Sequence, residues 1–401
     1  MRNLVVVLLI VLTNLSSCKS QSNPVIAPGA YSMGEYLPLI MGKKVGLLVN
    51  HSSLVGNVHL LDTLISLDVN ISKVFAPEHG FRGVNDAGEH VSNEVDAKTG
   101  IPIVSLFGRN KKPTLNQLEG IDVVLFDLQD VGVRFYTYIS TMHYMMEACA
   151  EAGVSFVVLD RPNPNGDYYA GPVLNPEFSS FVGMHPIPVV HGLTVGELAG
   201  MINGEGWLKG GLKCDLRVIK AKNWDHNIPY ELPVKPSPNL PNHLSVRLYP
   251  SLCFFEATNV SIGRGTFFPF QVIGYPNPTL GNFSFTPKSI EGMSKSPKQQ
   301  NVTCYGIDLR DTGNIPNFTF SYFVDMYEKL GKEPGFELNE RWFNLLAGND
   351  IILKEIKQGV SLTEVALLWQ EDLDHYGKLR DKYLLYSKED GSELPSVDTN
   401  E

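Results

Sequence analysis

Glu78 belongs to the most unusual run of reactive side chains in the sequence. Residues 77–83 read PEHGFRG and follow the apolar run 72–76 directly. A carboxyl group at the end of an apolar strand can be partly desolvated, which raises its pKa toward the range that a general acid needs. A salt bridge to Arg82 would lower that pKa instead, so both interpretations stay open. His79 can orient a carboxylate or bind a metal, but no HExxH motif or histidine cluster supports a metal site, and we predict none.

Polar clusters also follow three other apolar runs. Residues 50–53 (NHSS), 127–134 (DLQDVGVR) and 160–166 (DRPNPNG) each come where a predicted strand ends. Ligands of an open parallel sheet bind outside the carboxyl ends of its strands. Helix caps and turns explain a single Asp or Asn at such a place, whereas four loops that carry Glu, Asp, His and Arg together indicate a functional cleft.

The residues predicted to hold a substrate come from these loops and from later segments. They are Asn50, His51, His79, Arg82, Gln129, Arg134, Tyr136, Arg161, Asn163, His191, Asn239 and Arg264. Glu256 and Arg264 are the best candidates to reach the cleft from a second domain. Two simpler interpretations stay open: Arg161 can form an ion pair with Asp160, and the glycines beside Arg264 can serve a tight turn.

Carboxylates, amides, tyrosines and arginines suit a polyhydroxylated substrate that also carries an acid group. Two carboxylates across a site would serve glycoside hydrolysis, in which one of them protonates the leaving oxygen. The sequence has no GxSxG motif, so a serine esterase has no support. The residues alone therefore predict a hydrolase or a binder of sugar-like molecules.

The elements that position these loops alternate along the chain. Short β-rich runs occur at 45–50, 72–76, 101–106, 122–127 and 154–160. Segments of helical spacing, such as 139–152, separate them. Continuous apolar strands separated by helices indicate a parallel sheet covered on both faces, so we predict an α/β, Rossmann-like fold. No GxGxxG follows the first run, and neither a dinucleotide nor another cofactor is predicted.

Later segments predict a second, smaller α/β domain. A capping box at 194–197 opens a helix, and 214–220 follows as a strand. The proline-rich passage 229–241 then indicates the crossing between domains. Beyond it we predict a strand at 302–309 and helices at 318–330 and 361–372. The predicted divisions are a Rossmann-like catalytic domain at 33–227, the smaller domain at 228–386 and a polar tail at 387–401.

The first eighteen residues read as a lipoprotein signal peptide. Arg2 precedes the apolar run 4–12, and Leu15-Ser16-Ser17-Cys18 resembles a lipobox. Cys18 would be the lipidated first residue of an exported protein, tethered by residues 19–32 to a membrane of the cell envelope. An ordinary cleaved signal peptide is the alternative.

The charge and the cysteine content of the sequence indicate which partners and which cysteine chemistry to expect. The sequence has 401 residues and a net charge of −10, which argues against nucleic acid because phosphate binding needs a basic face. The four cysteines beyond Cys18 form no CxxC pair, and we expect at least Cys149 to be a buried free thiol.

Four motifs carry a resemblance to a known family. Residues 75–83, 127–138, 160–164 and 261–266 resemble the NamZ-type exo-β-N-acetylmuramidases, which are glycoside hydrolase family 171 and were earlier a domain family of unknown function. The resemblance covers roughly residues 33–386. It implies removal of N-acetylmuramic acid from the non-reducing end of peptidoglycan fragments, and a cleft between a Rossmann-like and a smaller α/β domain.

The resemblance also implies roles for single residues. Glu78 corresponds to the proposed catalytic acid, and Asp130, Asp127 and Glu256 are candidates for the second carboxylate. The lactyl carboxylate of N-acetylmuramic acid would pair with Arg82, Arg134, Arg161 or Arg264. The sequence departs from the pattern at Ala257, where a glycine is expected, and at Gln271, where the loss of a glutamate can alter substrate contacts. A muropeptide-binding lipoprotein without turnover and a hydrolase of another hexosaminide are the alternatives.

Overall fold

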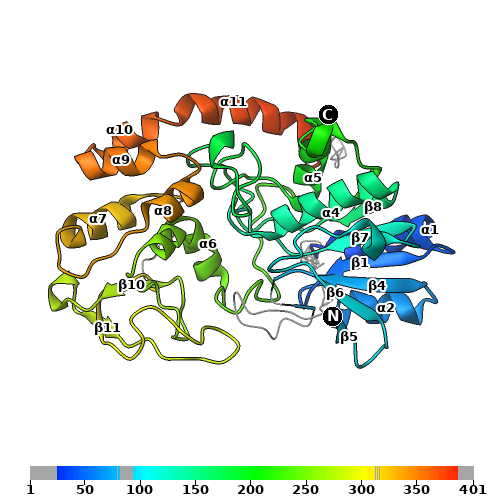
Figure 1. Ribbon diagram of the computed structural model, residues 1–401, viewed down its shortest axis with the longest axis horizontal. Coiled ribbons are helices and arrows are strands. Elements are labelled where there is room, and N and C mark those ends of the chain that lie inside the picture. The colour runs from blue at the N-terminus through cyan, green and yellow to red at the C-terminus, as the bar shows by residue number, and fades with distance from the viewer. Residues whose placement is uncertain are drawn as a thin grey trace, which may run out of the picture.

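The computed structural model describes residues 25–78, 80–81, 94–311, 313, 315 and 317–386. The predicted signal peptide with Cys18, the start of the tether and the tail 387–401 lie outside these ranges. No helix within them has the length and apolar character needed to cross a membrane. In Figure 1 a blue-to-green half contains the large sheet, and a green-to-red half contains most of the later helices.

A central sheet of seven strands organises the first half, and its order is β5-β6-β4-β1-β7-β8-β9. Its strands are β5 (Glu94–Val95), β6 (Pro102–Ser105), β4 (Ile71–Ala76), β1 (Val45–Val49), β7 (Val123–Asp127), β8 (Ser155–Leu159) and β9 (Leu216–Ile219). All pairs are parallel except β5 with β6. The six parallel strands follow the Rossmann order 3-2-1-4-5-6, whose switch point lies between β1 and β7. The predicted α/β, Rossmann-like fold is confirmed.

Helices cover both faces of this sheet because alternate strand residues point to opposite sides. Leu47 of β1 packs with residues of α1 (Met33–Ile40) and α2 (Leu60–Ser66). Its neighbour Leu48 belongs to a second cluster, with residues of α4 (Tyr138–Ala152) and α5 (Val195–Gly204). The short α3 (Leu115–Leu118) packs beside α4. The strands therefore read as continuous apolar runs, as predicted.

Local signals fix the ends of these helices. Thr194 and Glu197 form the predicted capping box at the start of α5. Gly153 ends α4 in the left-handed conformation, at φ 68°. A hairpin of β2 (Leu54–Val55) and β3 (Val58–His59) follows β1 and was not predicted.

The second half combines a small antiparallel sheet with helices. Its strands are β10 (Val272–Tyr275), β11 (Phe283–Phe285) and β12 (Cys304–Asp308), in the order β10-β12-β11. Its helices are α6 (His243–Leu252), α7 (Ser321–Leu330), α8 (Glu340–Ala347), α9 (Ile351–Gln358), α10 (Leu362–Leu367) and α11 (Gln370–Arg380). The predicted strand 302–309 and helix 318–330 correspond to β12 and α7. The single helix predicted at 361–372 is instead α10 and the start of α11, interrupted at Leu368 and Trp369.

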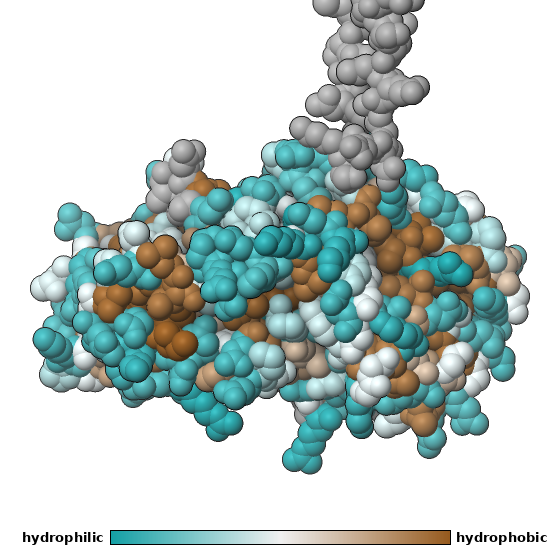
Figure 2. Space-filling model, turned by 90° about the horizontal axis from the view of Figure 1, so that it is seen from above, coloured by the Kyte–Doolittle hydropathy of each residue, from teal (hydrophilic) through white to brown (hydrophobic). Residues whose placement is uncertain are grey.

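The second half of the chain also exposes several large apolar side chains. Helices α9 and α10 lie on the upper side of Figure 1, the face shown in Figure 2, and carry the exposed Ile351 and Leu367, with the exposed Leu368 directly after α10. The four cysteines in the described ranges are buried free thiols, as expected for Cys149. They are Cys149, Cys214, Cys253 and Cys304.

Candidate functional site

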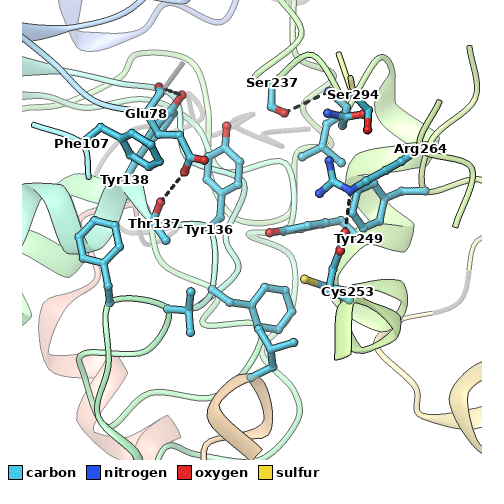
Figure 3. A pocket seen from close by; sticks show the side chains of 18 of the residues that line it. Glu78, Phe107, Tyr136, Thr137, Tyr138, Ser237, Tyr249, Cys253, Arg264 and Ser294 are labelled. Atoms are coloured by element: carbon cyan, nitrogen blue, oxygen red, sulfur yellow. Dashed lines mark hydrogen bonds and ion pairs between the residues drawn. The ribbon is translucent and has the colours of Figure 1, made fainter. Parts of the chain in front are cut away.

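A cleft of about 1130 Å³ is lined by residues from both halves of the chain. The first half contributes Glu78 after β4, Phe107 after β6 and residues 135–138 after β7. The second half contributes Tyr249 of α6, Glu256, Arg264 and Trp342 of α8, among others. Figure 3 shows Glu78 and Thr137 on one side of this cleft and Arg264 on the other. The rule that ligands bind outside the carboxyl ends of parallel strands, here called the strand-end rule, therefore identified one wall of the cleft. The second half of the chain supplies the opposite wall.

Glu78 lies two residues beyond β4, beside the first turn of α4. The hydroxyl of Thr137 donates to Oε2 of Glu78 at 3.5 Å. The hydroxyl of Tyr138 donates to the backbone carbonyl of Glu78 at 3.4 Å. Since Pro77 fixes the preceding φ, the backbone leaves the sheet in a restricted direction that points Glu78 into the cleft.

Glu256 faces the cleft as part of an ionic cluster. Nε of Arg264 donates to Oε1 of Glu256 at 2.6 Å, and Nζ of Lys298 lies 3.6 Å from Oε2. Burial alone would raise the pKa of Glu256, but the charges of Arg264 and Lys298 outweigh it, and the pKa is lowered. Glu256 is therefore held as a carboxylate and is a poor proton donor.

Arg264 keeps most of its hydrogen-bonding capacity. Only its Nε has a hydrogen-bond partner among the described residues, so both terminal nitrogens remain for a ligand. The flanking Gly263 and Gly265 have φ of 82° and 80°. A Cβ on Gly265 would come within 2.5 Å of the carbonyl oxygen of Lys288. The glycines do serve a tight turn, and that turn presents Arg264 to the cleft.

Asp127 and Arg161 form a buried ion pair away from the cleft. Nε and Nη2 of Arg161 donate to the two oxygens of Asp127 at 2.5 and 2.9 Å. Asp127 is fully buried and lines neither this cleft nor the smaller cavity described below. The alternative ion pair of Arg161 with Asp160 is not formed, because the guanidinium pairs with Asp127 and Arg161 donates to Asp160 through its backbone N–H.

Asp130, Asn163 and His191 brace the loops beneath the cleft. Oδ2 of Asp130 accepts the backbone N–H of Gly132 at 2.7 Å and lies 3.2 Å from Nε2 of His191. Nδ2 of Asn163 donates to the carbonyl of Leu193. None of the three lines the cleft, so Asp130 as a second catalytic carboxylate and Asn163 and His191 as substrate contacts have no geometric support here.

Arg134 is enclosed rather than exposed to a substrate. Its terminal nitrogens donate to the carbonyls of Pro172, Ile187 and Leu346 at 2.7–2.8 Å. Burial without a carboxylate partner lowers the pKa of Arg134 to about 9. The side chain joins three distant segments, and its predicted role in substrate binding is corrected to a structural one.

Two further predicted residues act through their neighbours. The fully buried Asn50 donates from Nδ2 to the hydroxyl of Tyr138 at 3.0 Å. Nε2 of His51 lies 2.8 Å from the carbonyl oxygen of Lys235, in the segment between the halves.

The predicted site residues lie in different parts of the structure. The cleft is lined by Glu78, Tyr136, Asn239, Glu256 and Arg264. Gln129 and Arg161 line a second, smaller cavity. His79 and Arg82 lie outside the described residues. Gln271 is buried, accepts from Asn242 and does not line the cleft, so its departure from the family pattern changes no cleft contact.

Sequence reasoning missed several lining residues of the cleft. Tyr138 and Thr137 adjoin Tyr136 and were within reach of the strand-end rule. Tyr249 and Trp342 lie on helices with an apolar pattern, where an aromatic residue normally indicates core. Among the described residues, no group of three or more His, Cys, Asp or Glu could hold a metal ion.

Comparisons with known proteins identify the family. Residues 45–244 match the family model "Exo-beta-N-acetylmuramidase NamZ, N-terminal", and residues 247–386 match its C-terminal counterpart. A relative from Bacillus subtilis (strain 168), "Peptidoglycan beta-N-acetylmuramidase NamZ", is 39% identical over 375 residues, which are 88% of this chain and 89% of the relative.

Solved structures agree as well. Two crystal structures of DUF1343 family proteins from Bacteroides fragilis share the fold. One has a TM-score of 0.83 and 43% identity, covering 91% of this chain and 99% of the other. The second has a TM-score of 0.77 and 29% identity, covering 90% of this chain and 99% of the other.

Proposed function

The chain belongs to the NamZ family of exo-β-N-acetylmuramidases, and from this premise we propose that it releases N-acetylmuramic acid from the non-reducing end of peptidoglycan fragments. Family membership makes the chain a peptidoglycan glycosidase and argues against a muropeptide-binding lipoprotein without turnover. The single observation that carries the finer proposal is the cleft in which Glu78 faces Arg264 across the two halves.

Glu78 is the proposed general acid. Glu78 and Glu256 are the acidic residues that line the cleft within the described ranges. Arg264 and Lys298 hold Glu256 as a carboxylate, whereas the general acid must deliver a proton to the leaving oxygen. Glu256 is therefore better suited to holding Arg264 in place, which leaves Glu78 as the candidate for the general acid.

Arg264 is the proposed receptor for the lactyl carboxylate. Of the four arginines considered from sequence, Arg264 is the one found in the cleft: Arg134 is enclosed by carbonyls, Arg161 lies outside the cleft, and Arg82 is not among the described residues. The two terminal nitrogens of Arg264 can bind a carboxylate in a bidentate manner. The nearby rings of Tyr136, Tyr249 and Trp342 offer apolar faces for a sugar.

The role of Glu78 is tested with a chromogenic β-N-acetylmuramide. We expect wild-type protein to release the aglycone, and Glu78→Gln to lower kcat by about 10²- to 10⁴-fold, the usual contribution of general acid catalysis. Glu119→Gln is the matched control, because Glu119 is exposed in the same half and does not line the cleft. Full activity of Glu78→Gln would remove Glu78 from the mechanism.

Substrate class is tested with a paired substitution. Arg264→Gln with Glu256→Gln removes both partners of the 2.6 Å ion pair together, and Lys298 keeps its hydrogen bonds to the carbonyls of Phe255 and Glu256. We expect KM for the muramide to rise about tenfold or more, in line with the worth of a hydrogen bond to a charged group. KM for the corresponding β-N-acetylglucosaminide, which lacks the lactyl group, should change little. Wild-type preference for the glucosaminide would instead favour a hydrolase of another hexosaminide.

We further propose that the protein is exported and anchored in the cell envelope through lipid on Cys18, where peptidoglycan fragments arise. The support is the lipobox and the preceding apolar run, both of which lie outside the described residues. Labelled fatty acid should be incorporated by the wild type and not by Cys18→Ser. No incorporation by the wild type would refute the anchor, and incorporation by both proteins would refute Cys18 as its site.

A further inference from the structure

A second cavity of about 450 Å³ lies at the same edge of the sheet and shares no lining residue with the cleft. Its walls come from the N-terminal segment, the β2–β3 hairpin and the segment that joins the halves. Lining residues include Ile26, Tyr31, Leu54, Tyr230 and Val234. The volume is within the range of small-molecule sites.

The position of this cavity is the one at which Rossmann-order sheets bind ligands. Leu54 follows β1 and Gln129 follows β7, the two strands that flank the switch point. Arg161 follows β8, the next strand along. The crevice outside the carboxyl ends of the strands at a switch point is the general ligand site of such sheets.

Two buried polar side chains at this cavity retain spare hydrogen-bonding capacity. Arg161 and Gln129 are only 4% and 3% exposed. Arg161 uses Nε and Nη2 on Asp127, and its Nη1 has no partner among the described residues. Gln129 donates from Nε2 to the carbonyls of Asp130 and Pro162, and its Oε1 has no partner within those residues either. Both atoms are accessible from the cavity that their side chains line, so both can bind a ligand there.

The donor and the acceptor belong to two loops that are bonded to each other and line the same cavity. Gln129 is bonded to the carbonyl of Pro162, the residue after Arg161, at 2.9 Å. Arg161 is in turn paired with Asp127, two residues before Gln129. A donor beside an acceptor complements a secondary amide, whose carbonyl accepts from Arg161 and whose N–H donates to Gln129.

Charge and shape narrow the ligand further. Asp127 neutralises Arg161, and Glu231 adds a negative charge at the cavity, so a neutral ligand is favoured over a carboxylate. The rings of Tyr31 and Tyr230 offer faces for a sugar, and Leu54 and Val234 can contact an acetamido methyl. We propose that this cavity is a second saccharide site, which binds a neutral N-acetylhexosamine through its acetamido group.

The segment 229–240 separates this site from the cleft. Tyr230 and Val234 line the second cavity, whereas residues 237, 239 and 240 line the cleft. Between them, His51 contacts the carbonyl of Lys235, and Tyr136 donates to the carbonyl of Pro236, both at 2.8 Å. Since the segment is fixed at these two points, each cavity can be filled without filling the other.

Binding is measured by saturation-transfer NMR with methyl β-N-acetylglucosaminide and with methyl β-glucoside, which lacks the acetamido group. Neither is the proposed muramide substrate, so the result does not depend on Glu78. Val234→Trp fills the second cavity, and Ser296→Trp fills the mouth of the cleft. Because the cleft can also bind a β-N-acetylglucosaminide, Val234→Trp is tested in the Ser296→Trp background. We expect Ser296→Trp to keep a transfer signal from the acetamido sugar and the double variant to lose it, with little signal from the glucoside in either.

Equal signals from the two glycosides in Ser296→Trp, no signal in that variant, or a signal that survives the addition of Val234→Trp would overturn the proposal. Circular dichroism checks that each variant is folded. If Val234→Trp does not fold, a crystal of the wild-type protein soaked in the acetamido glycoside decides. The sugar amide within hydrogen-bonding distance of Arg161 and Gln129 supports the site, and density confined to the cleft overturns it.

Discussion

Tyr138 connects the loop after β1 to the backbone at Glu78. Its hydroxyl accepts from Asn50 at 3.0 Å and donates to the carbonyl of Glu78 at 3.4 Å. Asn50 is held in turn by Ser52, whose backbone N–H and hydroxyl both donate to Oδ1. These contacts fix the point at which the chain carries Glu78 out of the sheet, so Tyr138 is a positioning residue for the proposed acid.

Replacing Tyr138 with phenylalanine keeps the ring and removes the hydroxyl. We expect kcat on a β-N-acetylmuramide to fall on the order of 10-fold, because a displacement near 1 Å at a reacting group can reduce the rate about 10²-fold. KM should change little, since the loss falls on the chemical step. Steady-state kinetics measures both parameters.

The matched control for this prediction is Tyr36→Phe. Tyr36 is buried in the same half, and its hydroxyl donates to the carbonyl of Ala30 at 3.0 Å, away from the cleft. Both variants lose one buried hydroxyl, so a purely structural role predicts equal effects. A fall in kcat of the same size in Tyr36→Phe would contradict the positioning role.

Single residues also show where sequence reasoning ends. The strand-end rule brought Glu78 and Tyr136 to the cleft because a strand's direction fixes the edge at which its loop emerges. The rule cannot tell which way a side chain turns within the loop. Arg134 turns inward because carbonyls from residues 172, 187 and 346 converge on it, and none of these is near it in sequence.

Among the elements, the last described segment fastens the second half onto the sheet. Within residues 381–386, the backbone N–H of Leu385 donates to Glu197 at 2.8 Å. The hydroxyl of Tyr386 donates to Oδ2 of Asp160 at 2.6 Å, at the carboxyl end of β8. Burial raises the pKa of Asp160 to about 6, against hydrogen bonds from Thr194 and Tyr386 that lower it.

Because the pKa of Asp160 is raised in the folded protein, its contribution to the free energy of unfolding depends on pH. Between about pH 4 and pH 6 the folded protein binds a proton on Asp160 that the unfolded chain has released. This group's contribution to stability therefore falls as the pH rises through that window. Tyr386→Phe removes a hydrogen-bond donor that favours the carboxylate form of Asp160, so the pKa of Asp160 rises further. The decrease in stability with rising pH therefore becomes larger and extends to higher pH.

We expect Tyr386→Phe to lower the free energy of unfolding by about 1.5–3 kcal/mol at pH 8, the usual value for a hydrogen bond to a charged group. The loss should be smaller at pH 5, where Asp160 is mostly protonated. Urea denaturation at both pH values measures it. Tyr383→Phe, which removes a bond to the exposed Glu205, is the control, and equal losses at both pH values would contradict the assignment to Asp160.

The elements were predicted unevenly for a physical reason. Strands buried on both faces produce long apolar runs, and these located β1, β4, β7 and β8. The hairpin β2–β3 and the edge strand β5 have only two residues per strand, too few for a pattern. The segment 381–386 has no pattern of its own, because distant partners determine its conformation.

At the scale of the whole molecule, the two halves share one hydrophobic core. The larger cluster includes Phe126 of the central sheet together with Phe254 and Phe343 of the second half. Phe135 joins them, with its ring centroid 5.4 Å from that of Tyr249 and 5.7 Å from that of Phe254. The proposed division at 227/228 therefore separates stretches of sequence that are packed against each other.

We predict that the two halves unfold together in a single transition. A chain of this length often unfolds in steps. One calorimetric transition whose enthalpy equals the van't Hoff enthalpy would show that the two halves unfold as one unit. Phe135→Ala removes the ring at the junction and should destabilise the protein by about 3–5 kcal/mol, the usual loss for a buried phenylalanine. Its transition should stay single and move to lower temperature, because neither half keeps a closed core without the other. Two resolved transitions in the wild type, or an isolated fragment 33–227 that unfolds cooperatively by itself, would show that each half is an independent folding unit.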